Sequence, residues 1–180
     1  MGQAHGQQPP GRPSAGAHGL DRFNSAPPHL AEAALLGCCG SRRWAERVAA
    51  HRPYPDLAAL FAAADEASYD LSPTELTRAL AGETAAGLLH HRTPQTAHTA
   101  LRAAHSAYQS RFGHAFVICL DDIRPAEHLD QVLAGIRSRL AHEPDEERTV
   151  AAGELRRLAR GRIARLVADA GRADSPSVPV

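Results

Sequence analysis

The stretch Tyr108–Cys119 constrains the fold more than any other part of the sequence. It is the only cluster of aromatic and β-branched residues in a chain that is poor in both. A helical pattern runs into it from Pro94 and breaks at Gly113, and the short apolar run Ala115–Leu120 follows. This run is far shorter than the roughly 20 apolar residues that cross a bilayer. We therefore expect it to be buried in the core, where Phe116 contributes a large apolar surface.

Prolines and a capping motif mark where the predicted helices begin. The clearest start is Ser72-Pro73-Thr74-Glu75, a capping box with proline at the first helical position. Apolar residues at helical spacing follow this motif and the other prolines, and the connections are short. Helices are expected from Pro27-Pro28 up to Gly37, around Trp44 up to Arg52, after Pro55, from Ser72 to Gly82, from Thr93-Pro94 to about Arg111, from Pro125 to Leu140 and from Pro144 to about Ala168.

This pattern predicts an all-α protein, a single-domain multi-helix bundle. Residues 19–170 form the predicted domain, and residues 1–18 and 171–180 are expected to be disordered tails. The first tail has no apolar run, so we do not expect it to be a signal peptide. Aromatic residues make up only 4% of the chain, which suits helices built from Ala and Leu and argues against a β-sandwich.

Charge and cysteine content exclude several classes of function. The net charge is zero, so we expect no general attraction to nucleic acids or to anionic membranes. Every basic residue other than histidine is arginine, and the absence of lysine excludes Schiff-base chemistry and a P-loop lysine. The three cysteines are Cys38, Cys39 and Cys119, an odd number without a CxxC pair, which predicts reduced thiols and a cytoplasmic protein.

Arg162 is the charged residue that the helical pattern singles out. When residues are placed 100° apart along the last predicted helix, Arg162 falls near the middle of the apolar stripe. The stripe consists of Ala151, Leu155, Leu158, Ala159, Ile163 and Leu166. A guanidinium is costly to bury without an anion. Arg162 is therefore predicted either to pair with a protein carboxylate, such as a glutamate from another helix, or to hold the carboxylate of a ligand at two points.

The eleven histidines do not form a recognisable metal site. His91, His98 and His105 repeat every seven residues, which separates neighbours by about 10 Å along a helix. Ligands of one ion must all lie near 2 Å from it. We therefore expect no bound metal, and histidines that are solvated or cap helices.

Several separated segments carry a family resemblance. They are Leu20–Asn24, Ala34–Trp44, Arg52–Tyr54, Ala107–Gly113 with Phe116–Ile118, Arg139-Leu140, Glu147, Glu154–Leu158 and Arg162-Ile163. In this order they resemble the OHCU decarboxylases, the 2-oxo-4-hydroxy-4-carboxy-5-ureidoimidazoline decarboxylases of urate breakdown. The resemblance covers about residues 19–170.

The resemblance implies an all-helical, often dimeric enzyme that acts without a cofactor. Members of this family remove CO2 from an unstable urate-derived intermediate to give (S)-allantoin. By position, Arg162 corresponds to the family's substrate arginine, and the backbone around Phe116, Val117 and Ile118 resembles the segment that holds the ring. A His/Glu pair would handle protons in such a reaction.

One family motif is missing. Members usually carry a His-Pro pair within a segment like His-Pro-Arg-Ile-Gly-Glu, and here that place reads Thr77-Arg78-Ala79-Leu80-Ala81-Gly82-Glu83. Glu83 is either the surviving catalytic acid or a solvated residue after a helix end. His90 or His91 could replace the lost base only if the chain folds back differently.

Two hypotheses follow from the sequence. The first is a carboxy-lyase of the OHCU decarboxylase type, or a relative acting on a different carboxylated heterocycle, with Arg162 and Glu83 as catalytic residues. The second is a catalytically silent member that serves as a helical binding or partner protein. The first predicts an open pocket where Arg162 meets the Phe116–Ile118 backbone. The second predicts a pocket filled by apolar side chains, or an acidic residue that forms an ion pair with Arg162 and leaves none of its charge for a ligand.

Overall fold

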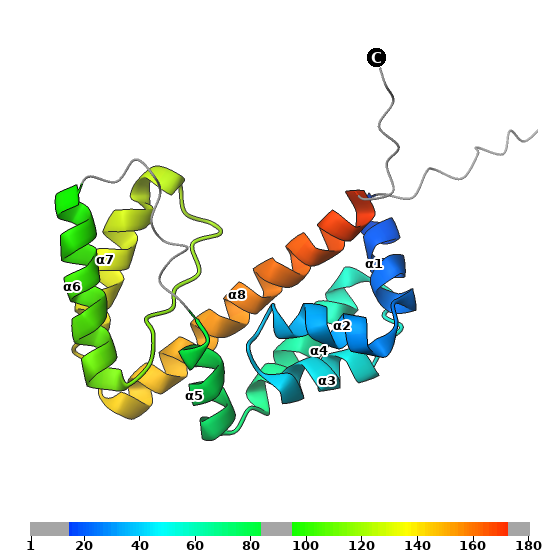
Figure 1. Cartoon of the computed structure of the whole chain (residues 1–180), viewed down its shortest axis with the longest axis horizontal. Coiled ribbons are helices and arrows are strands. Elements are labelled where there is room, and N and C mark those ends of the chain that lie inside the picture. The colour runs from blue at the N-terminus through cyan, green and yellow to red at the C-terminus, as the bar shows by residue number, and fades with distance from the viewer. Residues whose placement is uncertain (1–14, 84–94, 173–180) are drawn as a thin grey trace, which may run out of the picture.

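The computed structural model describes residues 15–83 and 95–172, and this part of the chain is helical without β-strands (Figure 1). The all-α prediction is confirmed. The helices are α1 (Ala15–Ser25), α2 (Pro28–Leu36), α3 (Arg42–Ala50), α4 (Leu57–Tyr69), α5 (Pro73–Ala81), α6 (Gln95–Phe112), the 3₁₀ turn η2 (Pro125–Glu127), α7 (His128–Arg139) and α8 (Pro144–Arg172). None of them is both long enough and apolar enough to cross a membrane.

Side-chain caps explain why several helices begin where they do. Ser72 accepts a hydrogen bond from the Glu75 N–H, and the Glu75 carboxylate accepts one from the Ser72 N–H at 2.8 Å, which completes the predicted capping box. Ser41 caps α3 in the same way through the Trp44 N–H, and Asp56 caps α4. The sequence therefore predicted the start of α5 correctly.

The helical part of the chain begins before the predicted domain boundary, with a helix, α1, that the sequence did not predict. Residues 15–18 are helical in α1, although they were assigned to the N-terminal tail, and α8 ends at Arg172, two residues past the predicted domain boundary. The reason is close packing of α1 on α8, where a Cβ on Gly19 would lie 1.8 Å from the Val167 carbonyl oxygen. The remainder of both predicted tails lies outside the described residues.

The long helix α8 supports two groups of helices. Figure 1 shows α1–α4 grouped along its C-terminal half, α6 and α7 paired near its N-terminal end, and α5 between them. The larger core is built from α1–α5 and α8, and a second core lies between α6 and α7. The second core contains Leu101, Tyr108, Phe116, Val132 and Ile136.

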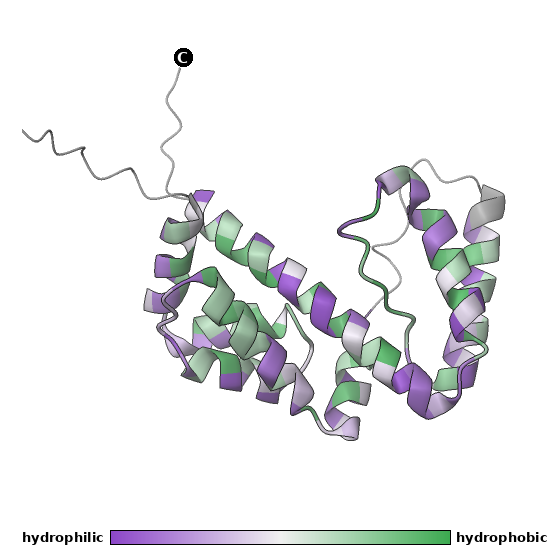
Figure 2. Cartoon of the chain, turned by 180° about the vertical axis from the view of Figure 1, so that it is seen from behind, coloured by the Kyte–Doolittle hydropathy of each residue, from purple (hydrophilic) through white to green (hydrophobic). Residues whose placement is uncertain are grey.

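The apolar run that follows α6 connects the two cores. Phe116 and Val117 are both buried, as expected, but Phe116 belongs to the α6–α7 core and Val117 to the larger one. Figure 2 shows this segment as hydrophobic where it passes between α8 and the α6–α7 pair. At its far end the Cys119 N–H donates to the Glu154 carboxylate of α8 at 2.8 Å. The run is thus held as extended chain between helices.

A buried ionic network joins α6, α7 and α8. Arg139 of α7 donates to the carboxylate of Glu147 of α8, with its Nε at 2.9 Å from Oε1, and both side chains are almost fully buried. The Tyr108 hydroxyl of α6 also donates to Glu147, and His142 binds the same carboxylate at 2.9 Å. A further Arg139 nitrogen donates to the Val117 carbonyl at 2.7 Å. The network therefore fixes the apolar run as well as the three helices.

The network shifts the pKa values of its members. Burial would raise the pKa of Glu147, but hydrogen bonds from Arg139, Tyr108 and His142 outweigh burial and hold it below its ordinary value of 4.5. Burial, together with the hydrogen bond to Glu147, raises the pKa of the Tyr108 hydroxyl well above its usual range. Glu147 is thus anionic and Tyr108 neutral around pH 7.

We predict that Glu147→Gln lowers the free energy of unfolding at pH 7 by about 3 to 5 kcal/mol, because Arg139 then stays buried without an anion. The lowered pKa of Glu147 means that its contribution is complete above about pH 4.5 and is lost as the pH falls through the folded-state pKa. The difference between wild type and variant should therefore shrink in acid. Urea unfolding from pH 3 to 8 measures it.

The matched control is Glu143→Gln, which removes an exposed carboxylate just before α8. It should leave the unfolding free energy within about 0.5 kcal/mol of wild type. A Glu147 variant as stable as this control at pH 7 would show that the network contributes no net stability.

Candidate functional site

Arg162 and Glu83 form a two-point ion pair. Arg162 lies on α8, and its two terminal nitrogens are each 2.7 Å from one oxygen of Glu83, which follows α5. The same guanidinium donates to the Cys38 carbonyl at 3.1 Å. The Arg162 side chain is 30% exposed and that of Glu83 12%, so the pair stands at the border between the interior and the solvent. Its hydrogen bonds to Glu83 raise the pKa of Arg162 above its ordinary value, and Arg162 is a permanent cation.

Two buried cysteines lie beside this pair, and both are neutral. Burial raises the pKa of the Cys38 thiol and raises that of Cys39 to about 11. A thiol rather than a thiolate is a poor nucleophile. The chain's three cysteines form no disulfide. Their contribution to the site is the Cys38 carbonyl, which helps to orient Arg162.

Glu83 also lines a cavity of about 320 Å³ between the end of α5 and the end of α6. The cavity is lined by Ala81, Glu83, His105, Gln109, Gly113, His114, Ala115 and Phe116. A volume of this size fits a small heterocycle, and half of the lining residues are polar or charged and can orient such a ligand. One carboxylate thus joins the Arg162 ion pair to a space that can hold a ligand.

Two histidines face this cavity, and their chemistry differs. The Nδ1 of His114 lies 3.0 Å from the Ala115 carbonyl, which can only accept, so Nδ1 carries a proton. Its Nε2 has no hydrogen-bond partner among the described residues, and in this tautomer Nε2 carries the lone pair of the neutral ring. His105 packs edge-on against Phe116, and burial lowers its pKa. Its Nε2 is buried without a partner in the described part of the chain.

The structure brings together only some of the residues predicted for the site. Glu83 and Phe116 line one cavity, and Arg162 binds Glu83. Val117 and Ile118 are not among the residues that line it. The Val117 carbonyl accepts from Arg139 instead of facing Arg162, and Ile118 packs on the α6–α7 core. Arg162 therefore meets Glu83 where we expected the Phe116–Ile118 backbone.

Other predicted positions lie elsewhere. His90 and His91, which could have replaced the missing base, lie outside the described residues. Within the described ranges, no group of three or more His, Cys, Asp or Glu side chains is placed to hold a metal ion. Two histidines that line the cavity are not among the predicted site residues: His105 enters the sequence argument only as a possible metal ligand, and His114 does not enter it. The sequence feature that could have identified His114 as a site residue is its position directly after Gly113, where the predicted helix breaks.

Comparison with known proteins places this geometry in context. The protein-family model described as OHCU decarboxylase matches residues 24–164 of this chain. A crystal structure of (S)-allantoin synthase superposes with a TM-score of 0.64 at 19% identity, covering 82% of this chain and 53% of that one. A crystal structure of OHCU decarboxylase in the presence of (S)-allantoin superposes with a TM-score of 0.64 at 22% identity, covering 73% of this chain and 95% of that one.

These structural matches show a shared fold. This chain spans about half the length of the (S)-allantoin synthase structure. A search of individually curated protein sequences found no match.

Gly113 turns the chain from α6 into the cavity wall, and we predict that Gly113→Ala lowers the free energy of unfolding by about 1 to 2 kcal/mol. Gly113 has φ = +76°, a left-handed conformation that costs other residues about this much. Gly153→Ala in α8 is the matched control, since a Cβ at either position would meet nothing within 4 Å. It should instead raise the unfolding free energy by about 0.5 to 1 kcal/mol. Equal effects in urea unfolding would contradict this account of Gly113.

Proposed function

The chain belongs to the OHCU decarboxylase family, and we propose that it converts 2-oxo-4-hydroxy-4-carboxy-5-ureidoimidazoline to (S)-allantoin and CO2 without a cofactor. The observation that carries this proposal is the Arg162–Glu83 pair at the edge of a cavity that two histidines also line. A carboxylate and two imidazoles line this small space, and a fixed cation binds the carboxylate; these are the groups that such a reaction needs.

Arg162 supplies the positive charge. In the proposed reaction the bond between the hydroxyl-bearing ring carbon and the carboxylate breaks, CO2 leaves, and the electron pair moves through the neighbouring ureido-bearing carbon onto a ring nitrogen, which takes a proton from solvent and leaves an enol. A guanidinium held by Glu83 and by the Cys38 carbonyl is already oriented and costs little reorganisation as negative charge develops. Arg162 would hold an oxygen of the substrate through that change.

His114 is our proposed proton carrier. The ring carbon that bears the ureido group must gain one proton, as the enol becomes a carbonyl, to give allantoin, and the proton must reach a single face of the ring for one enantiomer to form. The Ala115 carbonyl holds a proton on His114 Nδ1, so Nε2 of the neutral ring acts first as a base. It would take the proton of the substrate hydroxyl as that carbon becomes a carbonyl, and the resulting imidazolium would return a proton to the carbon that bears the ureido group. Glu83 lines the same cavity and can orient the ureido group by accepting from its N–H groups.

The same ion pair also supports the second hypothesis. Glu83 occupies both terminal nitrogens of Arg162, which is how a structural ion pair in a catalytically silent member would look. The cavity beside Glu83 favours the enzyme, because a silent protein has no need to keep this space open. Activity and its dependence on Arg162 separate the two hypotheses.

Partners and location belong to the same proposal. A homodimer is suggested by the family resemblance, and the three unpaired cysteines are consistent with a cytoplasmic protein. The zero net charge agrees with a small-molecule substrate rather than a nucleic acid.

To test the proposal, the intermediate is generated from urate with the two upstream enzymes, and the optical activity of the allantoin is followed after this protein is added. We expect (S)-allantoin to form faster than the spontaneous reaction. Arg162→Ala should abolish the activity, and His114→Gln should lower it about 100-fold, as expected for loss of general acid catalysis.

The control is His29→Gln, which replaces an exposed histidine on α2 and should leave the rate unchanged. Far-UV circular dichroism verifies that each variant keeps its helices. Racemic allantoin at the spontaneous rate with the wild-type protein would rule out the enzyme and leave the silent-member hypothesis. An active Arg162→Ala variant would remove Arg162 from the mechanism.

A further inference from the structure

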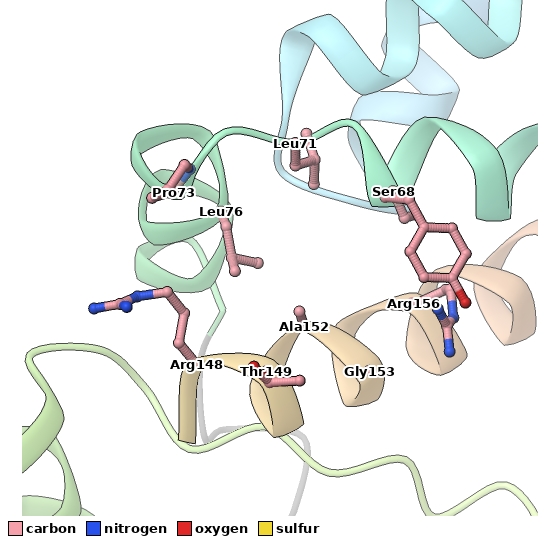
Figure 3. A pocket seen from close by; sticks show the side chains of 10 residues that line it. Ser68, Leu71, Pro73, Leu76, Arg148, Thr149, Ala152, Gly153 and Arg156 are labelled. Carbon is pink, nitrogen blue, oxygen red and sulfur yellow. The ribbon is translucent and has the colours of Figure 1, made fainter. Parts of the chain in front are cut away.

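A second cavity, of about 430 Å³, lies on a different side of α8 (Figure 3). The end of α4, the start of α5 and the N-terminal half of α8 enclose it. It is lined by Ser68, Tyr69, Leu71, Pro73, Leu76, Arg148, Thr149, Ala152, Gly153 and Arg156, none of which lines the cavity beside Glu83. The two spaces are therefore separate sites.

Apolar side chains from α5 and α8 face each other across part of this second cavity. Figure 3 shows Leu76 pointing from α5 toward Ala152 on α8, with Leu71 beyond it. Gly153 leaves this part of α8 open, since a Cβ there would meet nothing within 4 Å. A ligand with an apolar body of a single ring can contact these walls.

Arg156 provides a cation at one end of the cavity. Its guanidinium lies over the Tyr69 ring, 4.6 Å from the centroid, and no carboxylate pairs with it in the described part of the chain. Arg148 differs, because it pairs with Asp145 and extends away from the cavity in Figure 3. Stacking on an aromatic ring orients a guanidinium while its N–H donors stay free for an anion.

We propose that this cavity binds a small aromatic carboxylate, with the carboxylate on Arg156 and the ring between Leu76 and Ala152. The volume admits a ligand of this size, and the unpaired guanidinium selects an anion over a neutral compound. The site is independent of the decarboxylase reaction proposed for the cavity beside Glu83.

The chain contains a built-in reporter for this site. Trp44 is its only tryptophan, and the indole N–H donates to the hydroxyl of Ser68, which lines the cavity, at 3.0 Å. The same N–H donates to the Ala64 carbonyl at 2.9 Å. A ligand that contacts Ser68 will change this hydrogen bond, so the single indole N–H resonance of the ¹⁵N-labelled protein reports occupancy.

The test is a titration of the full-length protein with sodium benzoate, followed by ¹H–¹⁵N correlation spectra. We expect the indole N–H and the Gly153 amide to shift and to saturate, and benzamide, the neutral analogue, to bind at least tenfold more weakly. Arg156→Gln should weaken benzoate binding about tenfold or more, since it removes the charge-assisted hydrogen bond. Arg137→Gln, an exposed arginine of α7, is the matched control and should bind as wild type does.

Gly153→Leu places a side chain in the cavity and should abolish binding while Arg156 itself is retained. If circular dichroism shows that this variant loses its helices, the benzoate affinities of Arg156→Gln and Arg137→Gln decide whether the cavity binds the carboxylate through Arg156. Absence of a saturable shift with benzoate would overturn the proposal. Equal affinity for benzoate and benzamide, or unchanged binding by Arg156→Gln, would also overturn it.

Discussion

The buried contact between Arg139 and Glu147 is the interaction on which the rest of this structure depends. It joins α7 to α8, recruits Tyr108 from α6, and leaves one arginine nitrogen for the Val117 carbonyl. The extended run after Gly113 is thereby fixed between two cores. His114, Ala115 and Phe116 belong to this run and form one wall of the cavity beside Glu83. A charged network far from Arg162 thus sets the shape of the proposed site.

One helix carries the groups that hold both sides of that site. Glu147 and Glu154 anchor the run after α6 near the N-terminal end of α8, and Arg162 holds Glu83 two turns further along. A continuous 29-residue helix gives these three side chains a fixed spacing. Small shifts of α6 and α7 relative to α8 would therefore change the cavity while Arg162 stays in place.

Local signals in the sequence predicted the helices better than the site. Prolines and the Ser72 capping box determine helix starts through contacts within a few residues, so the sequence predicted the starts of α5 and α8. The helical stripe identified Arg162, and one of the two predicted partners, a protein carboxylate, is the partner observed, although Glu83 follows α5 and is not part of another helix. Helix α1 was not predicted, because its first turns depend on packing of Gly19 against α8. The pairing of Arg139 with Glu147 joins different elements, as does the lining of one cavity by Glu83 and His114, and no spacing rule predicts either.

A crystal structure with (S)-allantoin bound tests the central claim most directly. We predict that the ligand lies in the cavity beside Glu83, stacked near Phe116, with one oxygen on Arg162 and a nitrogen or oxygen within hydrogen-bonding distance of His114 Nε2. An allantoin molecule bound elsewhere, or an unoccupied cavity with the Arg162–Glu83 pair unchanged at saturating ligand, would contradict the account.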